Sequence, residues 1–128
     1  MAALPLDEDD VVGGVDTHKD LHAAAVLSAS GRLLGTAVFS TTTAGYGQLL
    51  SWLRGYGRLT RVGVEGTGSY GSGLMRHLRS DGVSVVEVNR PNRQMRRKRG
   101  KSDTVDAEAA ARAAHSGTAT GTPKEPGR

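Results

Sequence analysis

Short apolar runs alternate with polar, glycine-rich segments along this chain, and the first three runs predict β-strands. Residues 11–16 (VVGGVD) form a β-branched run that ends at an acid. Residues 22–41 (HAAAVLSASGRLLGTAVFST) contain two further apolar runs with a turn signal at Ser30 and Gly31 between them. We therefore expect three successive antiparallel strands in the first third of the chain.

Helical and strand patterns alternate over the rest of the chain. Apolar residues three and four apart predict helices over 46–54 and 69–82, and the Ala-rich segment 103–115 has a high intrinsic helix propensity. Short β-branched runs at 61–66 and 83–88 predict two more strands. The resulting order, βββαβαβα, indicates an α/β fold with a mixed sheet flanked by helices.

The chain has 128 residues, which suits one domain with a substantial core. We expect residues 1–10 to be a disordered acidic lead-in and residues 11–116 to form the folded domain. Residues 117–128 are rich in Gly, Pro and Thr without periodicity, and we expect a flexible tail or the start of a connector.

Cysteine and membrane signals are absent from the sequence. The chain contains no cysteine, which excludes disulfides and thiolate metal sites and favours a cytoplasmic location. No apolar run approaches the roughly 20 residues that span a bilayer, so we expect no membrane partner.

Positive charge is concentrated in one segment. The chain has 17 Lys and Arg against 13 Asp and Glu, for a net charge of +4. Residues 90–101 contain no acid, and the basic residues that we expect to bind nucleic acid there are Arg93, Arg96, Arg97, Lys98, Arg99 and Lys101. Such local charge predicts an anionic partner, and the phosphate backbone of nucleic acid is the obvious one.

Two acids end two of the predicted core strands. Asp16 closes the first strand and Glu65 closes the fourth, inside the glycine-rich stretch GVEGTG. In mixed α/β sheets, ligands bind at the carboxyl ends of parallel strands, where both acids would meet. Each acid alone could instead start a loop or cap a helix. The pair together favours a site.

Two further acids open the last predicted helix. Asp103 and Asp106 are three residues apart, so a helix would place both carboxylates on one face. One interpretation needs no metal, because Asp103 could be the N-cap and Asp106 the acidic third residue of a capping box. That interpretation does not account for the adjacent basic run or for the strand-end acids.

Metal-dependent phosphodiester chemistry accounts for all four acids. A carboxylate cluster could hold two Mg²⁺ ions, with Mn²⁺ as a substitute, and nearby Lys and Arg would bind the phosphate backbone. His18 and His22 flank Asp20, but no third ligand is close in sequence, so we do not expect them to bind metal. The literal string DEDD at residues 7–10 precedes the first predicted strand, and we expect no site there.

Three motifs, GGVDTHKDLHAAAV, VGVEGTGSYG and RGKSDTVDAEAAARAA, together resemble the N-terminal catalytic domain of DEDD-type insertion-sequence transposases. These relatives of the pilin-gene invertase use a RuvC-like, RNase H-type fold. The resemblance covers about residues 11–116. It implies that Asp16, Glu65, Asp103 and Asp106 are the catalytic and metal-binding acids of a DNA transposase or recombinase. It also implies DNA and a structured guide RNA as partners, and a homo-oligomer in the full-length protein.

The chain departs from that family after residue 116. Family members continue into a second domain with a serine nucleophile, which this sequence lacks, so we expect a truncated frame, a degenerate copy or an excised domain that is inactive alone in strand exchange. Other functions stay open: a stand-alone Holliday-junction resolvase or RNase H-like nuclease, and a noncatalytic nucleic-acid-binding remnant. Half of an actin-like sugar kinase is disfavoured because no second nucleotide-binding half is present.

Overall fold

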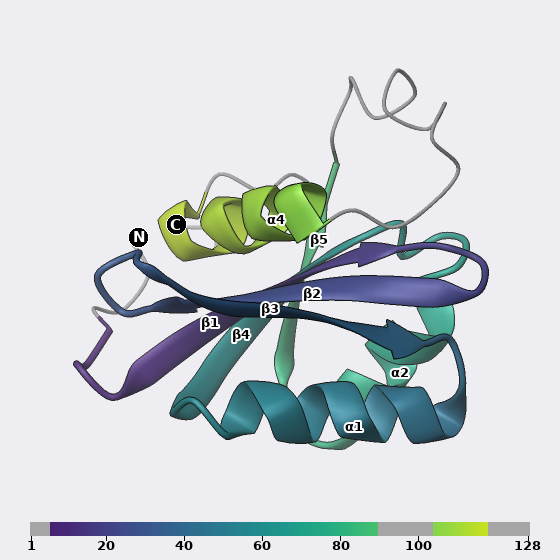
Figure 1. Ribbon diagram of the computed structural model, residues 1–128, viewed down its shortest axis with the longest axis horizontal. Helices are drawn as coiled ribbons and strands as arrows, with labels where there is room; N and C mark the ends of the chain where they lie inside the picture. The colour runs from purple at the N-terminus through teal and green to yellow at the C-terminus, as the bar shows by residue number, and fades with distance from the viewer. Residues whose placement is uncertain (1–5, 90–103, 118–128) are drawn as a thin grey trace, which may run out of the picture.

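The computed structural model describes residues 6–89 and 104–117, which form a mixed sheet with helices on both faces (Figure 1). The chain order of the described elements is the expected βββαβαβα. The elements are β1 Asp10–Thr17, β2 Leu21–Ser28, β3 Leu33–Ser40, α1 Thr43–Arg54, β4 Arg58–Glu65, α2 Ser72–Ser80, β5 Ser84–Val88 and α4 Thr104–Ser116.

The five strands lie in the order β3-β2-β1-β4-β5. The first three are antiparallel neighbours, whereas β4 pairs in parallel with β1 and β5 pairs in parallel with β4. A chain that crosses over from the third strand to lie beside the first generates this order, which is that of the RNase H-like fold. The predicted fold class is therefore confirmed.

Two helices, α1 and α2, cover one face of the sheet, and α4 covers the other (Figure 1). On the first face, leucines of α1 and α2 pack on β-branched residues of the central strands. The buried cluster contains Leu49, Leu50, Leu53, Leu74, Leu78, Val11, Val15, Val26, Val62 and Val64. Removing this much apolar surface from water is the main stabilising term of the fold.

The other face is built from small residues instead. The sheet side of α4 is formed by buried alanines, Ala107, Ala110, Ala111 and Ala114. Beneath them lie Gly14 and Gly63, which are register partners on β1 and β4. A Cβ atom on Gly14 would overlap the backbone of Ala107 and Ala111, and one on Gly63 would lie 2.5 Å from the carbonyl oxygen of Ala110. The two glycines therefore allow α4 to approach the sheet closely.

Several predicted boundaries shift by a few residues. The first helix begins at Thr43, before the predicted residue 46, because the Thr42 side chain accepts the backbone N–H of Gly45 and caps the helix. The fourth strand begins at Arg58, three residues earlier than predicted, because polar residues on its outer half still pair with β1.

The expectation of a disordered lead-in over residues 1–10 is wrong for its last residues. Asp10 is the first residue of β1 and is buried. The Arg58 guanidinium donates to Asp10 at 2.6 Å and to Asp7 at 2.7 Å. The hydrogen bond from Arg58 to the Asp10 carboxylate lowers the pKa of Asp10. Charge pairing thus orders the end of a segment that its composition alone suggested was unstructured.

Three predictions fall on residues outside the described ranges: the basic run at 90–101, Asp103, and most of the tail at 117–128. Within residues 6–89 and 104–117, no helix is both long enough and apolar enough to cross a membrane.

Candidate functional site

The first two acids lie side by side at the carboxyl edge of the sheet. Asp16 and Glu65 are register partners on the parallel strands β1 and β4. Residues paired in this way point to the same face, and two residues earlier Gly14 and Gly63 face α4. Since side chains alternate along a strand, both carboxyl groups are on the α4 face. They are 0% and 3% exposed.

The third acid comes from the start of α4. The C-terminal end of this helix lies toward the end of the sheet where β1 and β4 begin. Arg61, in the first half of β4, holds it there by donating to the carbonyl oxygens of Ala114 at 2.8 Å and His115 at 3.1 Å. The first turn of α4 therefore lies toward the carboxyl ends of β1 and β4. Asp106, the third residue of α4, is buried there, only 4% exposed.

A contact on β2 ties the first turn of α4 to the strand-end acids. Ala107 forms a buried cluster with Ala23 and Ala25, and Ala23 is the register partner of Asp16. The residue that follows Asp106 thus packs against the direct neighbour of Asp16. Three of the four predicted acids are brought to one face and one edge of the sheet, and the fourth, Asp103, lies outside the described residues.

The turn after β4 fixes the backbone next to Glu65. The Thr17 hydroxyl donates to the carbonyl oxygen of Glu65 at 2.6 Å, in a buried position. Gly66 follows with φ of 87°, and a Cβ atom there would also overlap the Thr17 hydroxyl. The carbonyl oxygen of Gly66 then accepts the N–H groups of Ser69 and Gly71. The glycine of the VEGTG motif is therefore required by its left-handed backbone and by this close contact.

Two histidines lie next to this turn: His18 follows the end of β1, and His22 is the second residue of β2. The Nε2 atom of His18 lies 3.6 Å from an Asp16 carboxylate oxygen. His22 is buried on the opposite face, where its ring stacks on Tyr46 and its Nδ1 accepts the His18 N–H at 3.3 Å. Burial lowers the pKa of His22.

The chemistry of the acids fits a hard divalent cation. Burying several carboxylates at one edge is unfavourable unless a positive charge or hydrogen bonds compensate, and carboxylate oxygens are the ligands that Mg²⁺ takes in proteins. Among residues 6–89 and 104–117, however, no three His, Asp or Glu side chains are grouped closely enough to hold an ion as they stand. Asp103 is not in that set. The metal site therefore stays a prediction.

Sequence reasoning missed two supports of this edge. Thr17 gave no motif signal, although its position directly after a strand-end acid is where a side chain can reach the neighbouring strand. The pair of Gly14 and Gly63 had a signal: each glycine precedes an acid by two residues, in GGVD and VGVE. This shared spacing places a glycine and an acid on the same face of each strand.

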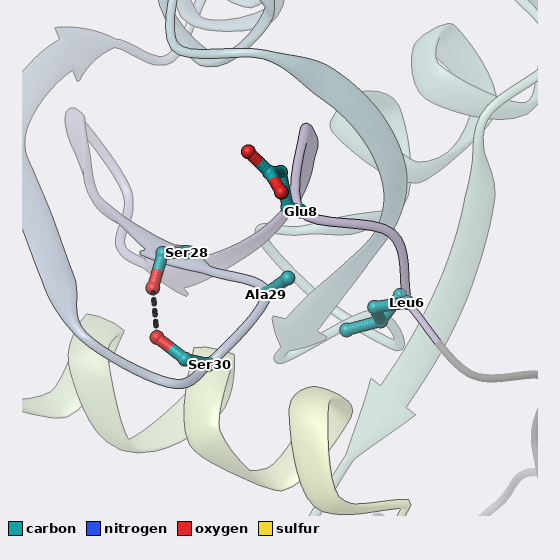
Figure 2. A pocket seen from close by; sticks show the side chains of 5 residues that line it. All are labelled: Leu6, Glu8, Ser28, Ala29 and Ser30. Atoms are coloured by element: carbon teal, nitrogen blue, oxygen red, sulfur yellow. Dashed lines mark hydrogen bonds between the residues drawn. The ribbon is translucent and has the colours of Figure 1, made fainter.

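A shallow depression of about 340 Å³ lies elsewhere, at the turn between β2 and β3 (Figure 2). Its lining residues are Leu6, Glu8, Ser28, Ala29 and Ser30. Ser28 pairs with Val11 near the start of β1, so this depression is at the opposite end of the strands from Asp16. The hydroxyls of Ser28 and Ser30 lie 3.0 Å apart and share a hydrogen bond, and the Ser28 hydroxyl oxygen also accepts the Arg32 N–H. Among the described residues that line it, Glu8 is the one that carries a titratable group, and this gives no basis for proposing a catalytic site.

Comparison with known proteins extends the sequence resemblance. A family model for the DEDD transposases of the IS110 type, described as a transposase, matches residues 13–126. No curated protein matches the chain.

Proposed function

The chain belongs to the IS110 family of DEDD transposases, and we propose that its carboxylate edge performs metal-dependent phosphodiester chemistry in DNA transposition. The observation that carries this proposal is the placement of Asp16, Glu65 and Asp106. They come from two parallel strands and a helix, yet all three are buried at the same edge and on the same face. Carboxylates supplied by separate elements at one edge are the kind of ligands that a shared divalent cation takes.

In this proposal Asp16, Glu65, Asp103 and Asp106 hold Mg²⁺, or Mn²⁺ in its place. When bound, the ions would activate the attacking oxygen and stabilise the leaving oxygen of the phosphodiester. The chain itself supplies rigidity. Thr17 and Gly66 fix the backbone beside Glu65, and Gly14 and Gly63 let α4 bring Asp106 close. Such positioning by surrounding groups is what a carboxylate site needs to bind metal in one geometry.

The basic run belongs to the segment between two elements that meet at the carboxylate edge. It connects Val88, the last residue of β5 and the register partner of Glu65, with Thr104, the first residue of α4. Both attachment points are at the carboxyl edge. We infer that Arg93, Arg96, Arg97, Lys98, Arg99 and Lys101 bind the phosphates of DNA near the acids. A structured guide RNA and assembly into a homo-oligomer are further parts of this proposal, and they rest on the resemblance alone.

The test is stabilisation of the purified 128-residue chain by metal. Thermal unfolding is measured with and without Mg²⁺ or Mn²⁺, for the native sequence and for Asp16→Asn with Glu65→Gln. A ligand present at 100 times its dissociation constant stabilises the folded state by about 2.7 kcal/mol. We expect a gain of this order in the native chain and its loss in the double variant.

A matched control removes the same two charges elsewhere. Asp81→Asn with Glu108→Gln breaks the ion pairs to Arg54 and Arg112 on the surface. This variant should keep the full metal-dependent gain. An equal gain in the native chain and the Asp16 and Glu65 variant would refute the proposed site.

A further inference from the structure

The two edge strands of the sheet differ in length and in charge. At one edge, β5 has five residues, and its Glu87 carboxylate lies 3.9 Å from the Arg79 guanidinium. At the other edge, β3 has eight residues, none of which is charged or a proline. Short strands, charges and prolines are the usual means by which proteins keep an edge from pairing with another chain. The β3 edge has none of these protections.

Backbone groups of β3 point away from the sheet, toward this open edge. The Thr41 N–H donates to the carbonyl oxygen of Asp20 at 3.0 Å, in line with the register of β3 on β2. Since hydrogen-bonding groups alternate along an antiparallel strand, the N–H and C=O groups of Thr36, Val38 and Ser40 face outward. In the described ranges β3 is the last strand on its side, and Figure 1 shows no labelled element beyond it.

Exposed apolar side chains gather beside the same edge. Most of the large apolar side chains that are exposed in residues 6–89 and 104–117 border β3, namely Leu21, Leu33, Val38 and Tyr56. Val38 is the register partner of Ala23 and lies with Leu21 on the α4 face. Tyr56 lies on the other face, where a Cβ atom on Gly35 of β3 would overlap its hydroxyl. Apolar surface therefore flanks the open backbone on both faces of the sheet.

The surrounding sequence carries no charge. Residues 33–53 cover β3 and all of α1 except its last residue, and they contain no Asp, Glu, Lys or Arg, although the chain has a net charge of +4. Copies of like net charge repel each other, so they associate most readily through a neutral surface, and interface cores are depleted of charge. Nucleic acid would need positive charge, which this surface lacks. We propose that β3 pairs in antiparallel orientation with β3 of a second copy of this chain.

Such a pairing is self-complementary about a two-fold axis. The outward N–H groups of one copy meet the outward carbonyl groups of the other, and the reverse holds equally. The two sheets become one continuous sheet, and the exposed leucines and Val38 of each copy are brought toward those of its partner. Asp16 is two strands away on β1, so the carboxylate edge stays open. The proposed function includes a homo-oligomer without a contact surface, and this inference supplies one.

The experiment is sedimentation equilibrium of the nuclease-treated 128-residue chain over a wide range of protein concentration. The native chain should dimerise. Val38→Lys should raise the dissociation constant of the dimer by about a hundredfold, because it places two positive charges at the shared edge. Val38 is 49% exposed, so the variant has room to fold. Tyr70→Lys is the matched control, because Tyr70 is also exposed but follows β4, away from β3, and it should leave dimerisation unchanged.

Amide hydrogen exchange shows whether the two copies pair through their backbones. In the native chain the N–H groups of Thr36, Val38 and Ser40 should exchange more slowly in concentrated than in dilute solution. In Val38→Lys the N–H groups of Thr36 and Ser40 should exchange at the same rate at both concentrations. Exchange protection at these alternate residues is a signature of strand pairing that contact through side chains alone would not produce.

The outcomes separate this inference from the proposed chemistry. A native chain that is monomeric at every concentration would overturn the β3 pairing, and so would a dimer that is equally stable in Val38→Lys. A dimer whose outward amides stay unprotected would also overturn it, because the copies would then meet elsewhere. The gain in stability on adding Mg²⁺ is measured in parallel. A chain that dimerises through β3 but shows no such gain would refute the carboxylate site and leave this inference standing.

Discussion

Gly14 on β1 is in such close contact with Ala111 on α4 that a methyl group on the glycine would overlap the helix backbone. This contact links two motifs that are almost a hundred residues apart. Because α4 can lie directly on the sheet only over a glycine, the residue two before Asp16 controls how near Asp106 comes to Asp16. The small-residue face is therefore part of the site, although none of its members carries a functional group.

Replacing Gly14 by Val should displace α4. The added side chain has no space beneath Ala107 and Ala111, and such overpacking costs about 3 kcal/mol. Chemical denaturation should show this loss of stability, and the gain on adding Mg²⁺ should shrink because Asp106 moves away. Gly47→Ala is the control: Gly47 is in α1 with no atom within 4 Å of the new Cβ, and it should stabilise the chain by about 0.5 to 1 kcal/mol. A Gly14→Val protein as stable as the native chain would contradict the close packing.

Replacing Thr17 by Val should weaken the site and the fold together. The change keeps the shape but removes the hydroxyl that donates to the Glu65 carbonyl oxygen, at a cost of about 1 to 3 kcal/mol for the buried acceptor. Thr60→Val removes a comparable bond, to the carbonyl oxygen of Val11 at the far end of the same strands. Unfolding with and without Mn²⁺ should show a reduced metal-dependent gain for Thr17→Val alone. Equal gains in the two variants would mean that Thr17 does not position Glu65.

Much of the fold followed from local pattern. Alternating apolar runs located the strands, and the turn at Ser30 and Gly31 located the first hairpin, since these signals depend on nearest neighbours. The ends of the elements were less certain because they depend on distant partners. Asp10, the first residue of β1, pairs with Arg58, which is 48 residues later, and a short window of sequence does not contain both.

The sequence predicted the part of the candidate site that depends on where strands end. Asp16 and Glu65 end adjacent parallel strands, which the order of elements implies. The approach of Asp106 depends on the direction in which α4 crosses the sheet, and Arg61 fixes this by binding its C-terminal carbonyl groups. The position of His18 depends on hydrogen bonds from Thr41 and to His22. Such contacts between loops leave no periodic signal.

The stability of the chain should fall as the pH drops below about 6.5, partly because of His22. Burial lowers the pKa of His22 from its ordinary 6.5, outweighing the opposing effects of the Leu21 backbone and the Asp16 charge. Below pH 6.5 the unfolded chain therefore binds the proton more readily than the folded chain. The stabilisation is complete above pH 6.5 and is lost as the pH falls toward the lowered pKa, with a slope of at most about 1.4 kcal/mol per pH unit.

His22→Gln isolates this contribution. The free energy of unfolding is measured by denaturant titration between about pH 5 and 7.5, a range in which His is the side chain that titrates when unperturbed. The native chain should show the steeper decline on the acid side of pH 6.5, because the other three histidines are common to both proteins. Parallel curves would show that His22 takes up its proton as readily in the folded chain as in the unfolded one.

The last prediction concerns the basic run between β5 and α4. Each phosphate contact that a protein makes on duplex DNA adds about 0.9 to the slope of log affinity against log salt concentration. Replacing Arg96, Arg97 and Arg99 by Gln should therefore lower the magnitude of that slope by up to about 2.7 if all three bind phosphates. The measurement is fluorescence anisotropy with labelled duplex DNA over a range of salt concentrations.

A second variant tests whether position matters or only net charge. Arg32, Arg54 and Arg79 are exposed, and Arg54 and Arg79 already pair with Asp81 and Glu87. Changing these three to Gln removes the same charge, but it should leave the salt slope nearly unaltered because long-range attraction is screened beyond about 10 Å at 0.1 M salt. If the two triple variants lose the same slope, binding follows overall charge, and the segment that joins Val88 to Thr104 has no special part in bringing DNA to the carboxylates.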